Sequence, residues 1–180
     1  DSATMMNKVF EIIEAKKIFN LDYNKLDILV HPSSYVHAII KFKDGMIKII
    51  AHDTNMKIPI FNSLYDKKQK SIQSDKLNLK KLNSLNLKQV NTNKFPSIKI
   101  IKRLQNKESL LETIIVLAND ELVNLFLLKK LSFTDINNCL QKLINMQKII
   151  NLSKSKPGNI NSTIILKELI RKKISKIIYQ

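Results

Sequence analysis

The sequence predicts an α+β protein in which a first part of helix and strand is followed by an all-α bundle. Three observations support this fold class: an amphipathic helical pattern at the start, an Asp-Gly turn between two β-branched runs, and helical periodicity from about residue 95 onward. The chain has only 2 glycines and 4 prolines among its 180 residues. This composition favours long regular elements with few tight turns.

Residues 3–19 form the first predicted helix. Apolar residues recur on one side at helical spacing and predict a buried face; they are Met5, Val9, Ile12 and Ile13. Polar residues occupy the opposite side; they are Thr4, Asn7, Lys8 and Glu11. The helix is therefore expected to have one face in the core and one face available for chemistry.

A short buried strand is predicted at residues 26–30. It should stop at His31-Pro32, because proline disfavours helix before it and donates no hydrogen bond to a sheet. Residues 36–43 and 46–51 then form a β-hairpin around Asp44-Gly45, which is a strong hairpin turn sequence.

The sequence becomes polar between residues 62 and 94, which predicts an extended linker. Three or four helices follow, with Pro157-Gly158 between two of them. Helix starts are predicted at a capping box formed by Ser109 and Glu112, at Thr134, and near Asn161 or Ser162. The predicted domain bounds are 1–61, a linker at 62–95, and a bundle at 96–180.

The formal net charge of +16 raises the possibility of a nucleic-acid partner. Nearly all the positive charge is lysine, however, with Arg103 and Arg171 as the two arginines, and the lysines are scattered. No apolar run approaches the ~18 residues of a membrane span. The single cysteine, Cys139, excludes an intramolecular disulfide within this chain and fits a reducing cytosol. We expect neither nucleic acid nor membrane as a partner.

The polar side of the first helix is the strongest candidate for a site. Asn7 and Glu11 stand at i, i+4, and Lys8 and Glu11 stand at i, i+3, so their side chains should converge. An amide, an ammonium and a carboxylate suit an anionic, oxygen-rich ligand, and Ser2 adds a hydroxyl at the helix start. On spacing alone, a solvated ion pair with Ser2 as a helix cap explains the same residues.

Other chemistry is weakly indicated. His37 and His52 are expected to be ordinary hairpin residues, whereas His31, at a strand end, is better placed for a site. The sequence has no Ser-His-Asp order, no glycine-rich phosphate loop and no zinc-ligand spacing.

The opening DSATMMNK, followed by EIIEA, resembles the signature of the 1-deoxy-D-xylulose 5-phosphate reductoisomerase family. Further segments resemble the family in the same order; they are HPSS at 31–34, NMKIPI at 55–60, FPSIK at 95–99, ANDE at 118–121 and FTDI at 133–136. The family has a dinucleotide-binding domain, a catalytic α/β domain and a helical bundle. The resemblance implies that this chain is a fragment: the last part of the catalytic domain, the linker and the bundle.

The resemblance also implies the function. The family converts 1-deoxy-D-xylulose 5-phosphate to 2-C-methyl-D-erythritol 4-phosphate with NADPH and a divalent ion (Mg²⁺, Mn²⁺ or Co²⁺), on the non-mevalonate route to isoprenoids. It implies a phosphosugar substrate, a cytoplasmic location and a homodimer when the chain is full length. The fragment alone is expected to be inactive.

By the same resemblance, Ser2, Asn7, Lys8 and Glu11 bind the substrate, Lys8 and Glu11 are catalytic, and Glu11 is one of three carboxylates on the metal. The residues that bind NADPH are implied to lie upstream, apart from Met56, which is implied to flank the nicotinamide end of the site. His31 is implied to contact residues that bind the ligand and not the ligand itself. The sequence departs from the family pattern at Val9 (usually glycine), at Thr54 and Asn55 (usually Pro-Asp) and at Lys57 (usually arginine). The alternatives are a basic nucleic-acid-binding module and a helical interaction module.

Overall fold

The computed structural model describes residues 1–65 and 70–179. The chain divides into two compact units. One, the helical unit, combines residues 1–27 with the chain from residue 91 onward. The other, the hairpin unit, is residues 28–90. The α+β class with a helical C-terminal bundle is confirmed. The domain bounds predicted from the sequence remain a prediction.

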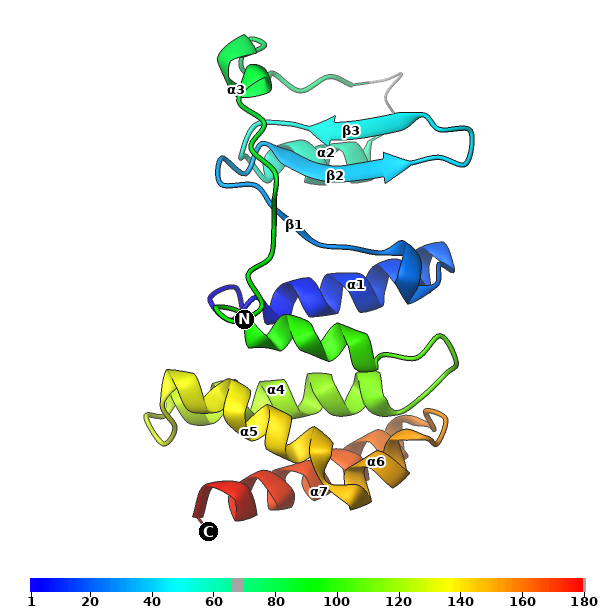
Figure 1. Ribbon diagram of the computed structural model, residues 1–180, viewed down its shortest axis with the longest axis vertical. Coiled ribbons are helices and arrows are strands. Elements are labelled where there is room, and N and C mark those ends of the chain that lie inside the picture. Colours follow the sequence, from blue (N-terminus) through cyan, green and yellow to red (C-terminus); the bar gives the residue numbers. More distant parts are fainter. Residues whose placement is uncertain (66–69, 180) are drawn as a thin grey trace. The chain divides into compact units, whose positions relative to one another are not determined.

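The helical unit is built from five α-helices and two 3₁₀ helices within the described residues. Their bounds are α1 Met6–Phe19, η1 Tyr23–Lys25, η2 Pro96–Arg103, α4 Leu111–Leu127, α5 Phe133–Asn145, α6 Gln147–Ser153 and α7 Ile160–Tyr179. In this unit α1 packs on η2, and α4 packs against α5, α6 and α7 (Figure 1). None of the described helices is both long and apolar enough to cross a bilayer.

The core of the helical unit is aliphatic. Its fully buried side chains come from α1, η2 and the bundle helices; they include Val9, Ile100, Ile114, Ile115, Leu122, Leu143, Ile149, Ile170 and Ile174. Burying each such side chain contributes about 1.5–3 kcal/mol. The apolar side of α1 therefore anchors this helix firmly, as its spacing predicts.

The start of α1 differs from the prediction. The helix begins at Met6 and not at Ala3, because Met5 adopts a left-handed backbone with φ 58°. Met6 is consequently the buried methionine, at 1% exposure, in place of Met5. Among the described residues Met5, at the N-cap position, makes no side-chain cap bond, and the N–H of Met6 donates to the Thr4 hydroxyl at 3.4 Å, so Ser2 is not the helix cap.

Two of the predicted caps are shifted along the chain. Ser132, and not Thr134, caps α5 by accepting a hydrogen bond from the backbone N–H of Asp135. Ahead of α7, the side chain of Asn159 accepts from the N–H of Ser162 at 2.9 Å, two or three residues before the predicted positions. In both cases the residue that caps is the last one outside the helix, as cap geometry requires.

The predicted capping box at α4 does not form. The helix begins at Leu111, and within the part of the chain that the structure describes it has no side-chain cap and the buried hydroxyl of Ser109 has no hydrogen-bond partner. The reason lies in Glu112, whose carboxylate is engaged by Tyr23 and Lys17 and does not turn back toward Ser109.

The hairpin unit contains the predicted β-hairpin. Strands β2 Val36–Lys41 and β3 Ile47–Ala51 pair antiparallel, with Lys41 opposite Ile47 and an irregularity between Val36 and Ala38. Gly45 has φ 90°, a conformation that a glycine adopts without strain. The Asp-Gly turn therefore sits where the sequence predicts it.

The remaining elements of this unit are short. They are β1 Leu29–Val30, α2 Lys57–Leu64, α3 Leu79–Asn83 and β4 Lys88–Gln89. β1 pairs antiparallel with β4, so the strand expected at residues 26–30 is confirmed only for its last two residues. Its predicted burial is wrong, because Leu29 is 41% exposed. The segment predicted as an extended linker holds the end of α2, then α3 and β4, except for residues 66–69, which lie outside the described residues. The prediction that this segment is extended is thus only partly correct.

Candidate functional site

The polar side of α1 brings three predicted site residues together. The Lys8 ammonium lies 2.7 Å from Oε2 and 3.0 Å from Oε1 of Glu11. The Asn7 amide donates to Oε1 of the same carboxylate at 3.4 Å. We call Ser2, Asn7, Lys8 and Glu11 the α1 polar patch. The convergence predicted from the i, i+3 and i, i+4 spacing is therefore present.

Ser2 lies in the loop that leads into α1. Its carbonyl oxygen accepts a hydrogen bond from the N–H of Met5 at 3.0 Å, and the residue is exposed. No recorded hydrogen bond joins Ser2 to Asn7, Lys8 or Glu11. The structure thus gathers Asn7, Lys8 and Glu11 directly and places Ser2 just before the helix that carries them.

The patch is accessible. The side chains of Lys8 and Glu11 are 42% and 52% exposed, so a ligand can reach both charges. At this exposure their ion pair contributes little to stability, about 0–1 kcal/mol. A ligand that offers an anion to Lys8, or a cation to Glu11, can therefore replace their mutual contact at little cost.

The patch contains one carboxylate, that of Glu11. Magnesium and manganese favour oxygen ligands, which Glu11 fits. Within residues 1–65 and 70–179, no group of three or more His, Cys, Asp or Glu side chains is placed to hold a metal. The role of Glu11 as one of several metal ligands remains a prediction.

Val9, which departs from the family glycine, points away from the patch and is fully buried. The helix continues through it without interruption from Met6 to Phe19. The valine side chain is accommodated in the core of the helical unit, on the side opposite Glu11.

The other candidate residues lie in the hairpin unit. The Nε2 atom of His31 is 2.7 Å from the Ser33 hydroxyl, and Met56 is 68% exposed just before α2. His37 and His52 stack on each other with ring centroids 3.5 Å apart, in keeping with ordinary hairpin residues. The roles of His31 and Met56 remain predictions.

A hollow of about 340 Å³ lies beside the loop that precedes α1. Ala3 and Thr4 line it from that loop, together with Lys94 and Ser97 near η2 and Asn137 on α5. None of the four patch residues is among its lining residues. A hollow of mixed polar and apolar lining therefore exists near the helix start, but the described residues do not enclose the patch in it.

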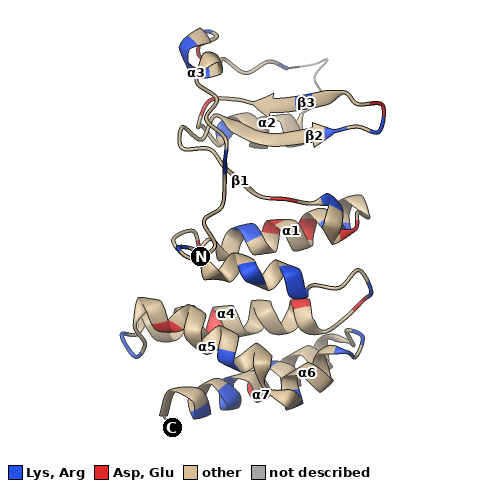
Figure 2. Ribbon diagram, viewed as in Figure 1, with Lys and Arg blue, Asp and Glu red and all other residues tan. Residues whose placement is uncertain are grey.

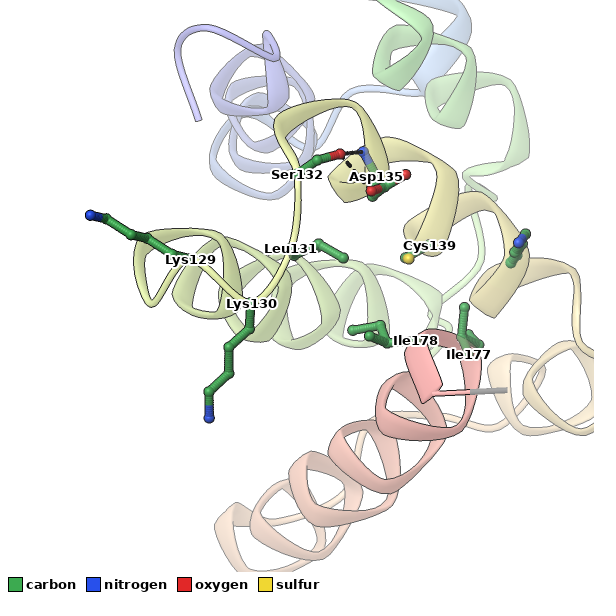
Figure 3. A pocket seen from close by; sticks show the side chains of 9 residues that line it. Lys129, Lys130, Leu131, Ser132, Asp135, Cys139, Ile177 and Ile178 are labelled. Atoms are coloured by element: carbon green, nitrogen blue, oxygen red, sulfur yellow. Dashed lines mark hydrogen bonds between the residues drawn. The ribbon is translucent and has the colours of Figure 1, made fainter.

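A second hollow, of about 550 Å³, lies between the α4–α5 connection, α5 and the end of α7 (Figure 3). Lys129 and Lys130 extend away from it, whereas the Cys139 sulfur, Ile177 and Ile178 lie around its centre. Burial, and then the charge of Asp135, raise the pKa of the Cys139 thiol, and Lys142 opposes this shift more weakly. The thiol is thus held in its unreactive protonated form.

Basic residues lie on several elements, and α7 alone carries five of them, Lys167, Arg171, Lys172, Lys173 and Lys176. Lysines occur along α1, η2 and α7 and in several connections, interspersed with acidic residues (Figure 2). The expectation that the protein has no nucleic-acid partner remains a prediction.

Two buried polar residues on α4 were not predicted as site residues. Asn119 and Glu112 are 1% and 6% exposed, and each bonds to a segment flanking α1. In the sequence each of them stands out as a polar residue within an apolar stripe, because Ile115, Ala118 and Leu122 lie around them at helical spacing.

Known proteins resemble this chain over most of its length. Residues 52–173 match the family described as "DXP reductoisomerase C-terminal domain". The chain is 54% identical over 175 residues to 1-deoxy-D-xylulose 5-phosphate reductoisomerase of Pelagibacter ubique, covering 97% of this chain and 45% of that protein. The Sulfurihydrogenibium enzyme of the same name is 36% identical over 140 residues, which cover 78% of this chain and 37% of that protein.

Solved structures of reductoisomerases also resemble this chain. The reductoisomerase from Zymomonas mobilis in complex with NADPH superposes with a TM-score of 0.85 at 26% identity, over 100% of this chain and 46% of that one. A DOX-P reductoisomerase in complex with NADPH, fosmidomycin and magnesium has a TM-score of 0.82 at 27% identity, over 99% of this chain and 45% of that one.

The structure defines an α+β protein with a C-terminal helical bundle. The chain belongs to the 1-deoxy-D-xylulose 5-phosphate reductoisomerase family. It spans about half the length of the curated relatives it matches.

Proposed function

We propose that the complete protein is an NADPH- and metal-dependent reductoisomerase that converts 1-deoxy-D-xylulose 5-phosphate to 2-C-methyl-D-erythritol 4-phosphate. The observation that carries the proposal is the convergence of Asn7, Lys8 and Glu11 on one accessible side of α1, at the family's motif positions. Relatives whose structures contain NADPH, magnesium and fosmidomycin support it.

In this proposal the patch binds the phosphosugar. The Lys8 ammonium provides a charged donor for phosphate, and Asn7 adds amide donors and an acceptor for hydroxyls. Ser2 contributes a hydroxyl from the preceding loop. A phosphate that takes the Lys8 ammonium frees the Glu11 carboxylate, because the two side chains are paired at 2.7 Å in the ligand-free arrangement.

Glu11 is proposed as one oxygen ligand of Mg²⁺, Mn²⁺ or Co²⁺. The bound ion supplies Lewis acidity toward the substrate carbonyl. Further carboxylates and the NADPH-binding residues are proposed to come from the rest of the complete protein. His31 is proposed to support the site and Met56 to flank the nicotinamide end.

The complete protein is further proposed to be a cytoplasmic homodimer that uses neither nucleic acid nor membrane as a partner. Exposed apolar side chains on both strands of the hairpin support contact with further protein; they include Ile39, Ile40, Ile47, Ile49 and Ile50, each at least 39% exposed. Light scattering of the complete protein tests this part, and a mass of one chain would contradict the homodimer.

The assay of the reaction is direct. The complete protein, given 1-deoxy-D-xylulose 5-phosphate, Mg²⁺ and NADPH, should oxidise NADPH only when the sugar phosphate and the metal are both present. The 180-residue chain alone should show no oxidation, since hydride transfer needs the cofactor-binding residues. Complete protein that is folded and inactive with each of Mg²⁺, Mn²⁺ and Co²⁺ would refute the proposed function.

A further inference from the structure

Asn119 is a buried polar residue whose side chain reaches the loop before α1. It is 1% exposed on α4, between the fully buried Ala118 and Leu122. Its Nδ2 donates to Oδ1 of Asp1 at 2.8 Å, a bond between residues 118 positions apart in the sequence. A buried amide without a partner destabilises a protein, so the bond to Asp1 accounts for an amide in this apolar stripe.

Asp1 in turn organises the loop that carries Ser2. Its carbonyl oxygen accepts from the N–H of Met6 and from the hydroxyl of Thr4, both at 3.0 Å. Met5 closes the loop with its left-handed backbone and its N–H bond to Ser2. Residues 1–6 therefore form one closed hydrogen-bonded loop, and the Asp1 carboxylate is its link to α4.

The other end of α1 is held by the same helix. Lys17, in the last turn of α1, and Tyr23, just after it, both bond to Glu112. Glu112 lies seven residues before Asn119, two turns away on the same side of α4. The ends of α1 are thus fixed by two buried polar residues of the bundle, and the Asn119 end is the one that carries the patch.

We propose that Asn119 is a positioning residue for phosphosugar binding: by holding the Asp1 carboxylate, it sets the loop that presents Ser2 and the first turn that presents Asn7 and Lys8. This inference rests on the proposed function of the α1 polar patch. Asn119 does not touch the ligand. It acts through Asp1, and a small displacement of the binding groups is enough to weaken productive binding.

The test uses the complete protein and three changes to this bond. Asn119→Asp keeps the shape of the side chain but places a second carboxylate against that of Asp1. Asp1→Ala removes the same hydrogen bond by deleting its exposed partner. Each should raise the KM for 1-deoxy-D-xylulose 5-phosphate about 10- to 100-fold, with a smaller change in kcat. The double variant Asp1→Asn with Asn119→Asp reverses the amide and carboxylate, and should return KM to within about threefold of wild type.

Asn124→Asp is the matched control, since it makes the same chemical change at an exposed position further along α4. It should leave KM unchanged. Thermal unfolding should separate displacement from unfolding: Asp1→Ala leaves the buried Asn119 amide without its acceptor, so its melting temperature should fall by a few degrees while the variant stays folded at the assay temperature.

Amide hydrogen exchange of residues 2–7 in ligand-free protein gives a readout that does not depend on activity. Exchange should be faster in Asn119→Asp and Asp1→Ala and should recover in the swapped pair. If the wild-type protein is inactive, the proposed function fails while the exchange data still decide whether Asn119 orders the loop. A folded, active Asp1→Ala variant with wild-type KM, or a swapped pair that recovers neither KM nor exchange, would overturn the positioning role.

Discussion

The Lys17 ammonium lies 2.7 Å from Oε2 of Glu112, and the Tyr23 hydroxyl donates to Oε1 of the same carboxylate. The Glu112 side chain is only 8% exposed, whereas that of Lys17 is 59% exposed. One carboxylate of the bundle therefore joins the last turn of α1 to the turn that follows it, through charge-assisted hydrogen bonds.

Glu112→Ala should lower the free energy of unfolding by about 1–3 kcal/mol, because it leaves the buried Tyr23 hydroxyl without its acceptor. Glu108→Ala is the matched comparison. Glu108 also pairs with a lysine, Lys156, but both side chains are at least 75% exposed, so the cost should stay below about 1 kcal/mol. Urea unfolding of both variants measures the difference, and equal losses would contradict the role of burial.

Tyr23→Phe should change how stability depends on alkaline pH. Burial first, and then the hydrogen bond and negative charge of Glu112, raise the pKa of the Tyr23 hydroxyl above its ordinary value. The unfolded chain therefore loses this proton at a lower pH than the folded chain does. The stabilisation that the protonated Tyr23 hydroxyl provides is complete below about pH 10 and decreases as the pH rises above it.

Unfolding free energies measured between about pH 8 and pH 11 test this dependence. Wild type should lose stability above about pH 10 more steeply than Tyr23→Phe, in which the titrating group is absent. Parallel curves for the two proteins would show that the proton on Tyr23 is not linked to folding. Circular dichroism at pH 8 checks that the variant is folded at the start.

Val9→Gly, which restores the residue usual in the family, should destabilise this protein. Val9 is fully buried in the middle of the first half of α1, so glycine loses the buried side chain and adds backbone freedom. The expected cost is about 2–4 kcal/mol. Thermal unfolding measures it. An unchanged or higher melting temperature would mean that the valine is strained in its site.

Much of the fold could be predicted from local patterns. The apolar spacing of α1, the Asp-Gly hairpin and the bundle depend on residues close in sequence, and all three are present. Elements fixed by distant partners were not predicted. β4 has no strand-like pattern of its own and exists by pairing with β1, about 60 residues earlier.

For the helix starts and the site too, local spacing predicts some features, and others depend on geometry that only the folded chain sets. Ser132 and Asn159 were missed by two or three residues because several capping residues stand together, and only geometry selects one of them. The convergence of Asn7, Lys8 and Glu11 follows from helical spacing. The bond from Asn119 to Asp1 does not, because it joins two segments that only the folded chain brings together.

The most direct test of the α1 polar patch is steady-state kinetics of the complete protein across a Mg²⁺ titration, comparing wild type with Glu11→Gln and Lys8→Ala. Glu11→Gln should strongly depress kcat and raise the metal concentration required, because it removes a charged ligand while keeping the shape. Lys8→Ala should chiefly raise KM, because it removes a charged donor to phosphate. The expected loss of binding free energy is about 1.5–3 kcal/mol.

Glu14→Gln is the control, since it makes the same change at an exposed position of α1 one turn from Glu11, and it should behave as wild type. Circular dichroism should show all three variants folded, because the changed side chains lie away from the buried face of Val9, Ile12 and Ile13. The proposal predicts a metal-dependent defect in Glu11→Gln and a KM defect in Lys8→Ala. Folded variants with near wild-type kinetics at every metal concentration would contradict it, and would leave Lys8 and Glu11 as an ordinary exposed ion pair.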